Sequence, residues 1–206
     1  MVRSNRQGIV APLVVAVVMA VAAVAPVFVT AQSAPATQTR PAGTRVNVPP
    51  GALQVDDGDT VTIRWSAGDT EIVRILGIDT PETRHDEHDI PYDQAFGRES
   101  RAFAHGVFAA ARSVQILRAS MTDPYARTLA YLFVDGRNYS VMAIDGRFAA
   151  ESVTAFGDNG FPAEAAAVLA AAKAAGPVPF EPPHIYRARM RTVTTWLKSQ
   201  GQYPPP

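Results

Sequence analysis

One short segment combines a cation with two carboxylates at the end of an apolar run. Residues 74–83 read RILGIDTPET, so Arg74 lies five residues before Asp79, which lies three before Glu82. Proline has no N–H and a fixed φ, so the step at Pro81 ends the strand that residues 74–78 predict. Asp79 and Glu82 are therefore expected on a rigid turn at a strand end, where with Arg74 they can hold a metal ion against a phosphate.

Two other segments supply matching groups. Residues 57–60, DGDT, precede a predicted strand and place two acids around a glycine; carboxylate oxygens are ligands that Ca²⁺ and Mg²⁺ prefer. Residues 123–127, DPYAR, precede another predicted strand and bring a second arginine beside a tyrosine. Arginine binds phosphate through paired hydrogen bonds, a metal polarises a phosphoryl oxygen, and a glutamate can take a proton from water. Together these groups suit phosphodiester hydrolysis.

The three segments, in this order, resemble the staphylococcal nuclease (thermonuclease) family from about residue 55 to about residue 176. The resemblance implies that Asp59 and Asp79 are Ca²⁺ ligands. It also implies that Thr80 lends its backbone carbonyl to the metal and that Asp57 is a nearby acid supporting the metal site. The block at 74–83 is the specific part of the likeness, since DGDT alone is a common turn sequence.

The same resemblance assigns the remaining site residues. Arg74 and Arg127 match the arginines that bind phosphate and stabilise developing charge, and Glu82 matches the proposed general base. Tyr125 matches a tyrosine that lines the nucleotide pocket. The family's reaction is cleavage of the 5′ P–O bond, leaving 3′-phosphate ends. The sequence thus predicts a Ca²⁺-dependent nuclease for DNA or RNA, acting as a monomer without a stable protein partner.

The chain also departs from the family at positions near the substrate. Pro124 and Ala126 stand where many members have a lysine and a glycine, which removes a phosphate contact and puts alanine, which resists positive φ, in the loop. The expected tyrosine pair is missing from residues 152–156, where Phe156 alone can stack.

The N-terminal segment predicts export. Two arginines within residues 1–6 precede a nearly all-apolar run over 8–29, and V-T-A at 29–31 suits a signal peptidase. We expect a signal peptide over 1–31 and a secreted or periplasmic protein; the alternative is a retained anchor helix, which alone would bring a membrane contact. The 206-residue chain has no cysteine, so stability must come from packing without disulfides.

Charge is unevenly distributed along the neutral chain. Residues 51–181 hold eleven Lys and Arg against all nineteen Asp and Glu, a net of −8, whereas residues 182–206 hold four basic residues and no acid. An acidic domain repels a polyanion at long range, so bound metal or the basic C-terminal segment must offset this charge near the substrate.

The predicted elements indicate an α+β, mainly β, fold. Residues 32–50, rich in Ala, Pro, Thr and Gln, predict a disordered linker before a nuclease domain at 51–181. Strands are expected at 52–55, 61–65, 71–78, 114–118 and 128–134, and helices at 97–112, 140–146 and 162–175. This order predicts a five-stranded OB-type barrel with three helices. Residues 182–206 add an amphipathic C-terminal helix and tail, with the apolar stripe Tyr186, Met190, Val193 and Leu197.

Several alternatives stay open at this point. The stretch 85–89, HDEHD, is expected to be a solvated part of the polar loop 83–96, with a transition-metal site as the competing interpretation. The C-terminal helix is expected to cover the barrel with its arginines facing solvent, though it can equally add phosphate contacts. For the whole protein the alternatives are a nuclease-like module that binds nucleic acid or protein without catalysis, and an anchored adhesive surface protein.

Overall fold

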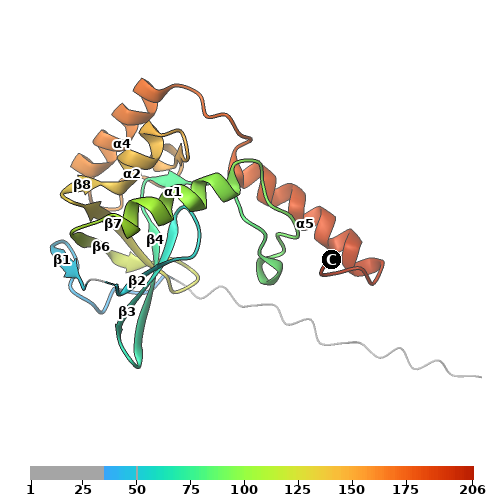
Figure 1. The fold of residues 1–206 in the computed structure, drawn as a ribbon, viewed down its shortest axis with the longest axis horizontal. Coiled ribbons are helices and arrows are strands. Elements are labelled where there is room, and N and C mark those ends of the chain that lie inside the picture. The colour runs from blue at the N-terminus through green and yellow to red at the C-terminus, as the bar shows by residue number, and fades with distance from the viewer. Residues whose placement is uncertain (1–34, 50) are drawn as a thin grey trace, which may run out of the picture. The chain divides into compact units, whose positions relative to one another are not determined.

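The structure, a computed structural model, describes residues 35–49 and 51–206. Its centre is a curved mixed sheet with strand order β1-β6-β7-β4-β3-β2 (Figure 1). These strands are β1 (Arg45–Val48), β2 (Leu53–Val55), β3 (Thr60–Ser66), β4 (Asp69–Ile75), β6 (Val114–Thr122) and β7 (Thr128–Val134), with β8 (Arg137–Asn138) added beside β7. A second, two-stranded sheet pairs β5 (Ile78–Asp79) with β9 (Ala150–Glu151).

Apolar alternation fixes which face of the sheet is buried. Val61 and Ile63 of β3, with Val73 and Ile75 of β4, are almost completely buried, while residues between them reach the other face. Pairing is antiparallel throughout the main sheet except between β4 and β7, which run parallel. The predicted α+β class and OB-type arrangement fit this sheet.

The number of strands and the closure differ from the prediction. Within the described residues β1 and β2 are the two ends of the strand order and do not pair with each other, so the sheet is a half-barrel. The strand predicted over 71–78 is divided: Gly77, at φ 82°, ends β4 and redirects the chain into β5. This turn carries the following residues away from the main sheet.

The predicted disordered linker is wrong for residues 35–49. Strand β1 pairs with β6, with Arg45 opposite Leu117, and the N–H of Gln38 donates to the carbonyl of Ser120 at 2.8 Å. Strand β6 has an edge whose backbone groups pair with β1. Because β6 lies far along the chain from β1, the local composition of residues 35–49 does not predict this pairing. The predicted signal peptide at 1–31 lies outside the described residues, as do 32–34 and 50.

The three predicted helices of the domain are present as α1 (Gly97–Ala109), α2 (Tyr139–Asp145) and α4 (Pro162–Ala175). Pro162 starts α4 and Gly176, at φ 72°, ends it. Helix α2 packs against β7, and α4 packs against α2 (Figure 1). The short helix α3 (Val153–Phe156) and the 3₁₀ turn η1 (Asp86–His88) were not predicted.

Helix α5 (Pro183–Ser199) packs on the segment that contains η1. Tyr186 and Met190 form a small second core with Ile90. The hydroxyl of Tyr186 donates to the carbonyl of Tyr92 at 2.8 Å, and that of Thr194 donates to the carbonyl of Asp89 at 3.1 Å. These contacts hold α5 in one position against the loop, so its side chains have a defined direction.

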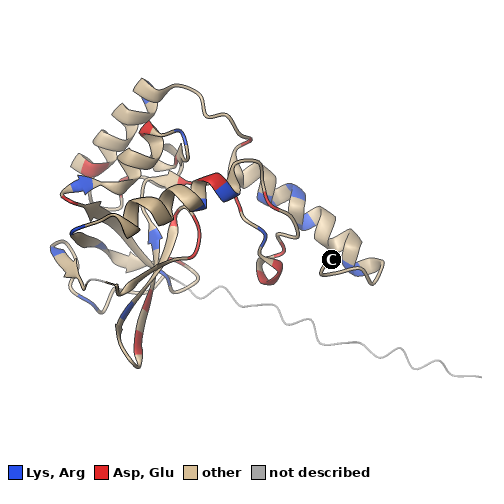
Figure 2. Cartoon of the chain, in the orientation of Figure 1, with Lys and Arg blue, Asp and Glu red and all other residues tan. Residues whose placement is uncertain are grey.

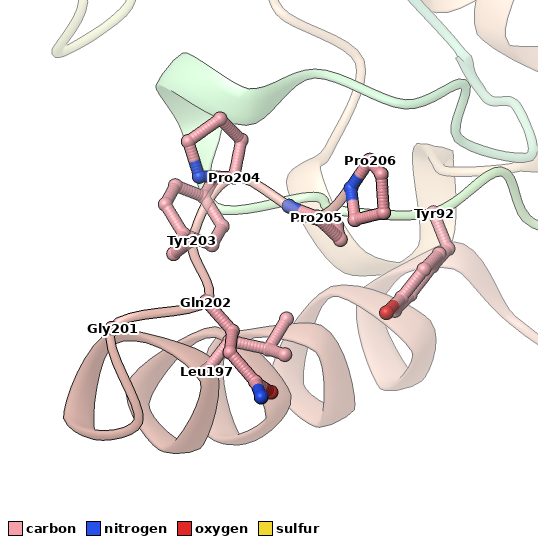
Figure 3. A pocket seen from close by; sticks show the side chains of 8 residues that line it. All are labelled: Tyr92, Leu197, Gly201, Gln202, Tyr203, Pro204, Pro205 and Pro206. Atoms are coloured by element: carbon pink, nitrogen blue, oxygen red, sulfur yellow. The ribbon is translucent and has the colours of Figure 1, made fainter.

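The C-terminal residues fold back over α5. The N–H of Gln202 donates to the carbonyl of Leu197 at 2.9 Å, and Arg84 donates to the carbonyl of Pro205 at 2.5 Å. A hollow of about 460 Å³ lies here, lined by Tyr92, Leu197 and residues 201–206 (Figure 3). None of the predicted site residues lines it. No helix within 35–49 and 51–206 has the length and apolar character that a membrane span requires.

Candidate active site

Strand register brings the three sequence blocks together. In the β3–β4 hairpin Thr60 pairs with Arg74, so Asp59, one residue before β3, lies beside the end of β4. The carbonyl of Asp59 accepts a hydrogen bond from the N–H of Ile75 at 2.8 Å. Strand β7 runs parallel to β4 with Thr128 opposite Val73 and Leu129 opposite Arg74, so the 123–127 turn joins β7 next to the part of β4 that carries Arg74. The predicted convergence of the three blocks therefore follows from two strand pairings.

Asp59 connects these blocks through both of its carboxylate oxygens. Oδ1 forms an ion pair with Nη1 of Arg74, and Oδ2 accepts the N–H of Thr80 at 2.7 Å. Asp59 is only 2% exposed. Oδ1 of Asp57 accepts a hydrogen bond from the N–H of Asp59 at 2.9 Å, so Asp57 orients the backbone of Asp59.

Gly58 is required for close approach. A Cβ at this position would lie 2.3 Å from the hydroxyl oxygen of Ser100 and 2.9 Å from the Cβ of Thr80. The hydroxyl of Tyr139 also donates to the carbonyl of Gly58 at 2.7 Å. The glycine thus lets the 57–60 loop pack against the turn that carries Thr80, and the acids on either side of it are placed accordingly.

Arg74 bridges the two predicted metal ligands. Its Nη1 contacts Asp59, and its Nη2 donates to Oδ1 of Asp79 at 3.0 Å and to the carbonyl of Ile78 at 3.3 Å. Burial lowers the pKa of Arg74, while the negative charges of Asp79 and Asp57 oppose that change. An arginine stays protonated under such conditions, so the bridge between the two carboxylates is a permanent cation.

The structure adds a residue that the sequence analysis missed, Arg187 of α5. Its Nη1 and Nη2 donate to Oδ1 and Oδ2 of Asp79 at 2.9 and 3.0 Å, and Nη1 also donates to Oε1 of Glu82 at 2.5 Å. The expectation that the arginines of this helix face solvent is therefore wrong for Arg187, although Arg189 and Arg191 are exposed. The sequence signal that could have indicated this role is the position of Arg187 next to Tyr186, at the border of the apolar stripe.

The carboxylates differ in the direction of their pKa shifts. For Asp79, burial raises the pKa, but the hydrogen bonds and charges of Arg187 and Arg74 outweigh it, and the pKa lies below its ordinary value. For Glu82, burial is the largest effect and raises the pKa despite Arg187, with help from the negative charges of Asp57 and Asp79. Burial likewise raises the pKa of Asp57, against the opposing charge of Arg74.

Glu82 is held in place by the segment leading into α1. Its N–H donates to Oε1 of Gln94 at 3.1 Å, and its carbonyl accepts the N–H of Gln94 at 2.8 Å. Gln94 in turn donates from Nε2 to the carbonyl of Glu181 at 2.6 Å, just before α5. A Cβ at Gly97 would lie 2.2 Å from the Glu82 carbonyl oxygen, so this helix start must be glycine.

The 123–127 turn is organised by Asp123. Its Oδ1 accepts the N–H groups of Tyr125 and Arg127 at 2.9 and 2.8 Å, and its Oδ2 pairs with Nε of Arg127 at 2.7 Å. Ala126 adopts φ 61°, so the alanine takes the left-handed conformation that glycine favours. The guanidinium of Arg127 lies 5.5 Å from the ring centre of Tyr125, a residue that is 62% exposed.

Arg127 is electrostatically part of the same site. Its charge lowers the pKa of both Asp57 and Arg74, although it makes its own ion pair with Asp123. Tyr125 and Arg127 therefore present an aromatic face and a partly exposed cation beside the carboxylates. The structure thus links Asp57, Asp59, Arg74, Asp79, Thr80 and Glu82 through hydrogen bonds and ion pairs, whereas Arg127 acts on them through its charge and Tyr125 lies beside Arg127.

The oxygen donors suit a hard cation. Asp59 and Asp79 direct Oδ1 atoms to one guanidinium, so the two carboxylates converge, and Thr80, the residue after Asp79, donates its N–H to Oδ2 of Asp59. Among the residues that the structure describes, no three or more His, Asp or Glu side chains are grouped to hold a metal ion. A bound Ca²⁺ would therefore complete its six to eight ligands with water and substrate oxygens.

The segment predicted as a solvated loop is a folded turn. His85 and His88 stack with ring centroids 4.2 Å apart, and His85 pairs with Ile90 in a short β-bridge. Asp89 of this turn forms an ion pair with Lys198 of α5. Figure 2 shows acidic residues in red on this loop and basic residues in blue on α5. The turn is thus the docking surface for α5.

The fold and this charged site define an OB-type domain suited to bind a phosphate or a divalent cation. Residues 72–168 match the family model described as "Staphylococcal nuclease homologue". The chain is also 30% identical over 83 residues to the SPbeta prophage-derived endonuclease YokF of Bacillus subtilis (strain 168), a match covering 40% of this chain and 27% of that protein. The predicted resemblance to the staphylococcal nuclease family is therefore confirmed over residues 72–168, a range that contains the 74–83 and 123–127 blocks.

Proposed function

We propose that this protein is a Ca²⁺-dependent nuclease that hydrolyses phosphodiester bonds of DNA or RNA. One observation carries the proposal: the buried carboxylates of Asp59 and Asp79 converge on Arg74, with Glu82 alongside, in a staphylococcal-nuclease-like domain. A charged cluster of this kind is costly to build for stability alone, since each buried charge must be desolvated. Phosphodiester chemistry uses all of its parts.

The residues present would hold the metal at one edge of the site. Asp59, Asp79 and the carbonyl of Thr80 are the proposed Ca²⁺ ligands, with Asp57 holding the backbone of Asp59. An ion bound there would polarise a phosphoryl oxygen and offset its charge. Arg74 contacts Oδ1 of both Asp59 and Asp79, so its guanidinium lies beside the atoms proposed to hold the ion.

The two arginines act on the phosphate itself. Arg74 and Arg127 approach the site from β4 and from the start of β7, and each offers N–H donors to the equatorial oxygens as negative charge develops on them. Tyr125, largely exposed beside Arg127, provides a ring face on which a base can stack. Phe156, 72% exposed, offers another aromatic surface.

Glu82 is the proposed base that takes a proton from the attacking water. Burial raises its pKa, which increases its basicity relative to an ordinary glutamate. The backbone hydrogen bonds to Gln94 keep its main chain fixed while the side chain exchanges partners. Export to the periplasm or medium, predicted from residues 1–31, would place the enzyme where extracellular nucleic acid is the substrate.

The test is hydrolysis by the chain from Gln32 onward, using plasmid DNA, single-stranded DNA and RNA with Ca²⁺, Mg²⁺, Mn²⁺ or a chelator. We expect activity with Ca²⁺ that the chelator abolishes. Arg127→Ala should lower turnover about 100-fold or more while leaving the fold intact, because a charge-stabilising donor is lost. Arg112→Ala is the matched control, since Arg112 is an exposed arginine paired with Asp135 away from the site.

The alternative is a module that binds nucleic acid without cleaving it. Binding in a gel-shift assay with no hydrolysis under any of the ions would favour that alternative and contradict the nuclease proposal. Near-normal turnover of Arg127→Ala would contradict the role given to Arg127 while leaving the activity itself in place.

A further inference from the structure

Helix α5 inserts a cation into the site from outside the matched family region. The family match ends at residue 168, and Arg187 lies beyond it, on a helix that starts at Pro183. Its guanidinium contacts both oxygens of Asp79 and one oxygen of Glu82, and its side chain is only 30% exposed. Arg187 therefore occupies oxygens of one proposed metal ligand and of the proposed base.

The position of Arg187 is set by the docking of its helix. Tyr186, the residue before it, is buried against Ile90 and hydrogen-bonded to the carbonyl of Tyr92. Farther along α5, Thr194 and Lys198 both contact Asp89. A side chain on a helix anchored at several points keeps its direction, so the contact with Asp79 is a built feature of the fold.

Arg187 and a divalent cation would compete for the carboxylate oxygens of Asp79. Asp79 already accepts Arg74 on Oδ1, and Arg187 takes both Oδ1 and Oδ2. A divalent ion needs at least one of these oxygens and would bring its charge close to the guanidinium, where like charges repel strongly because little water separates them. Metal and Arg187 cannot both keep full contact with Asp79.

We propose that Arg187 is a further residue of this site: it holds Asp79 and Glu82 in the absence of metal, and a divalent cation must displace it to bind. This inference rests on the proposed function for the identity of the metal ligands. Its consequence is that α5 sets the metal affinity of the domain. A free guanidinium on α5 also becomes available near the phosphate once the metal is bound.

The experiment measures Ca²⁺ binding directly, by calorimetry on the chain from Gln32 onward without nucleic acid. Arg187→Met keeps the long side chain that packs along the helix but removes the charge. We expect this variant to bind Ca²⁺ about tenfold or more tightly than the unmodified chain, because charge-assisted hydrogen bonds no longer oppose the metal. Arg187→Lys, which keeps the charge without the paired donors, should fall between them.

Arg189→Met is the matched control on the same helix. Arg189 pairs with Glu181 and is exposed, so its removal should leave the Ca²⁺ affinity within about twofold of the unmodified chain. Circular dichroism verifies that each variant retains its helices. Thermal unfolding without Ca²⁺ should also show a lower midpoint for Arg187→Met than for Arg189→Met, since only the former loses a partly buried ion pair.

The outcomes separate this inference from the nuclease proposal. Equal or weaker Ca²⁺ binding by Arg187→Met would overturn the competition, whatever the activity of the enzyme. Tighter binding without any nuclease activity would support the competition and contradict the proposed function. If neither the unmodified chain nor Arg187→Met binds Ca²⁺, the inference falls together with the metal site.

Discussion

At the site, each carboxylate takes its properties from different neighbours. Asp79 faces two guanidinium groups, which lower its pKa, whereas Glu82 is buried with one partner and its pKa is raised. Two neighbouring acids whose pKa values shift in opposite directions suit different roles. Asp79 is suited to stay ionised for a metal, and Glu82 is suited to exchange a proton. Arg74 has a structural role as well, since its removal would leave Asp59 without its cation.

Replacing Glu82 by glutamine should separate stability from activity. Because the pKa of Glu82 is raised above 4.5, the folded protein binds this proton more tightly than the unfolded chain does. The free energy of unfolding therefore falls as the pH rises from 4.5 to the raised pKa of Glu82. Above that pKa the whole loss of stability is present. Glutamine does not ionise, so Glu82→Gln should be more stable than the unmodified chain at pH 7 and equal to it below pH 4.5.

Urea unfolding across this pH range, with a chelator present, measures the difference. Turnover of Glu82→Gln with Ca²⁺ should fall about 100-fold or more, as expected when a general base is removed. Glu87→Gln, at an exposed position in η1, is the control and should change neither quantity. A variant that is less stable than the unmodified chain at pH 7 would contradict the burial argument.

At the scale of elements, tight packing between loops fixes the site. The 57–60 loop lies against Thr80 and Ser100, and the start of α1 lies against the backbone of Glu82, with glycine at both contacts. Strand register determines which site residues face one another. The close packing at Gly58 and Gly97 determines the distances between those residues. Adding a single methyl group at either contact must therefore move a predicted ligand or the predicted base.

Gly58→Ala should destabilise the domain by about 1–3 kcal/mol, the usual range for overpacking a close contact. Activity should fall too, because relief of the clash moves Asp59 or Thr80. Gly68→Ala, in the turn between β3 and β4, is the matched control: nothing lies within 4 Å of its added Cβ, and its stability should change little. Equal unfolding midpoints in urea for the two variants would contradict the close-approach argument.

At the scale of the whole molecule, charge is arranged so that α5 complements an acidic domain. Residues 51–181 carry a net charge of −8, and the four basic residues of the C-terminal segment all lie on α5. Three of them form ion pairs with residues that precede the helix: Arg187 with Asp79, Arg189 with Glu181 and Lys198 with Asp89. Much of the basic charge is therefore used to dock α5 rather than to attract a polyanion.

A bound divalent ion should stabilise this acidic molecule. A ligand that binds only the folded state adds about 2.7 kcal/mol at 100 times its dissociation constant, which corresponds to roughly 5–10 °C for a domain of this size. We expect Ca²⁺ to raise the midpoint of thermal unfolding by that amount and a chelator to reverse it. Asp59→Asn should abolish the rise, and a rise of the same size in this variant would place the metal elsewhere.

Much of the fold and the site followed from the sequence. The strands predicted at 61–65 and 128–134 and the helix predicted at 162–175 depend on local residue patterns, so those elements lie close to the predicted positions. The three blocks were recognisable because residue types and spacing near a strand end are also local properties. Asp59, Asp79 and Arg74 meet as expected.

Tertiary structure alone decided the rest. Strand β1 exists because β6 offers an unpaired edge, and the chain divides at Gly77 because β5 finds β9; both partners lie far away along the chain. Arg187 reaches Asp79 from 108 residues away, through a helix whose sequence shows only an apolar stripe and basic residues. Local composition sets which elements form, whereas the partner of a charge or a strand edge depends on which distant surfaces the packed chain brings into contact.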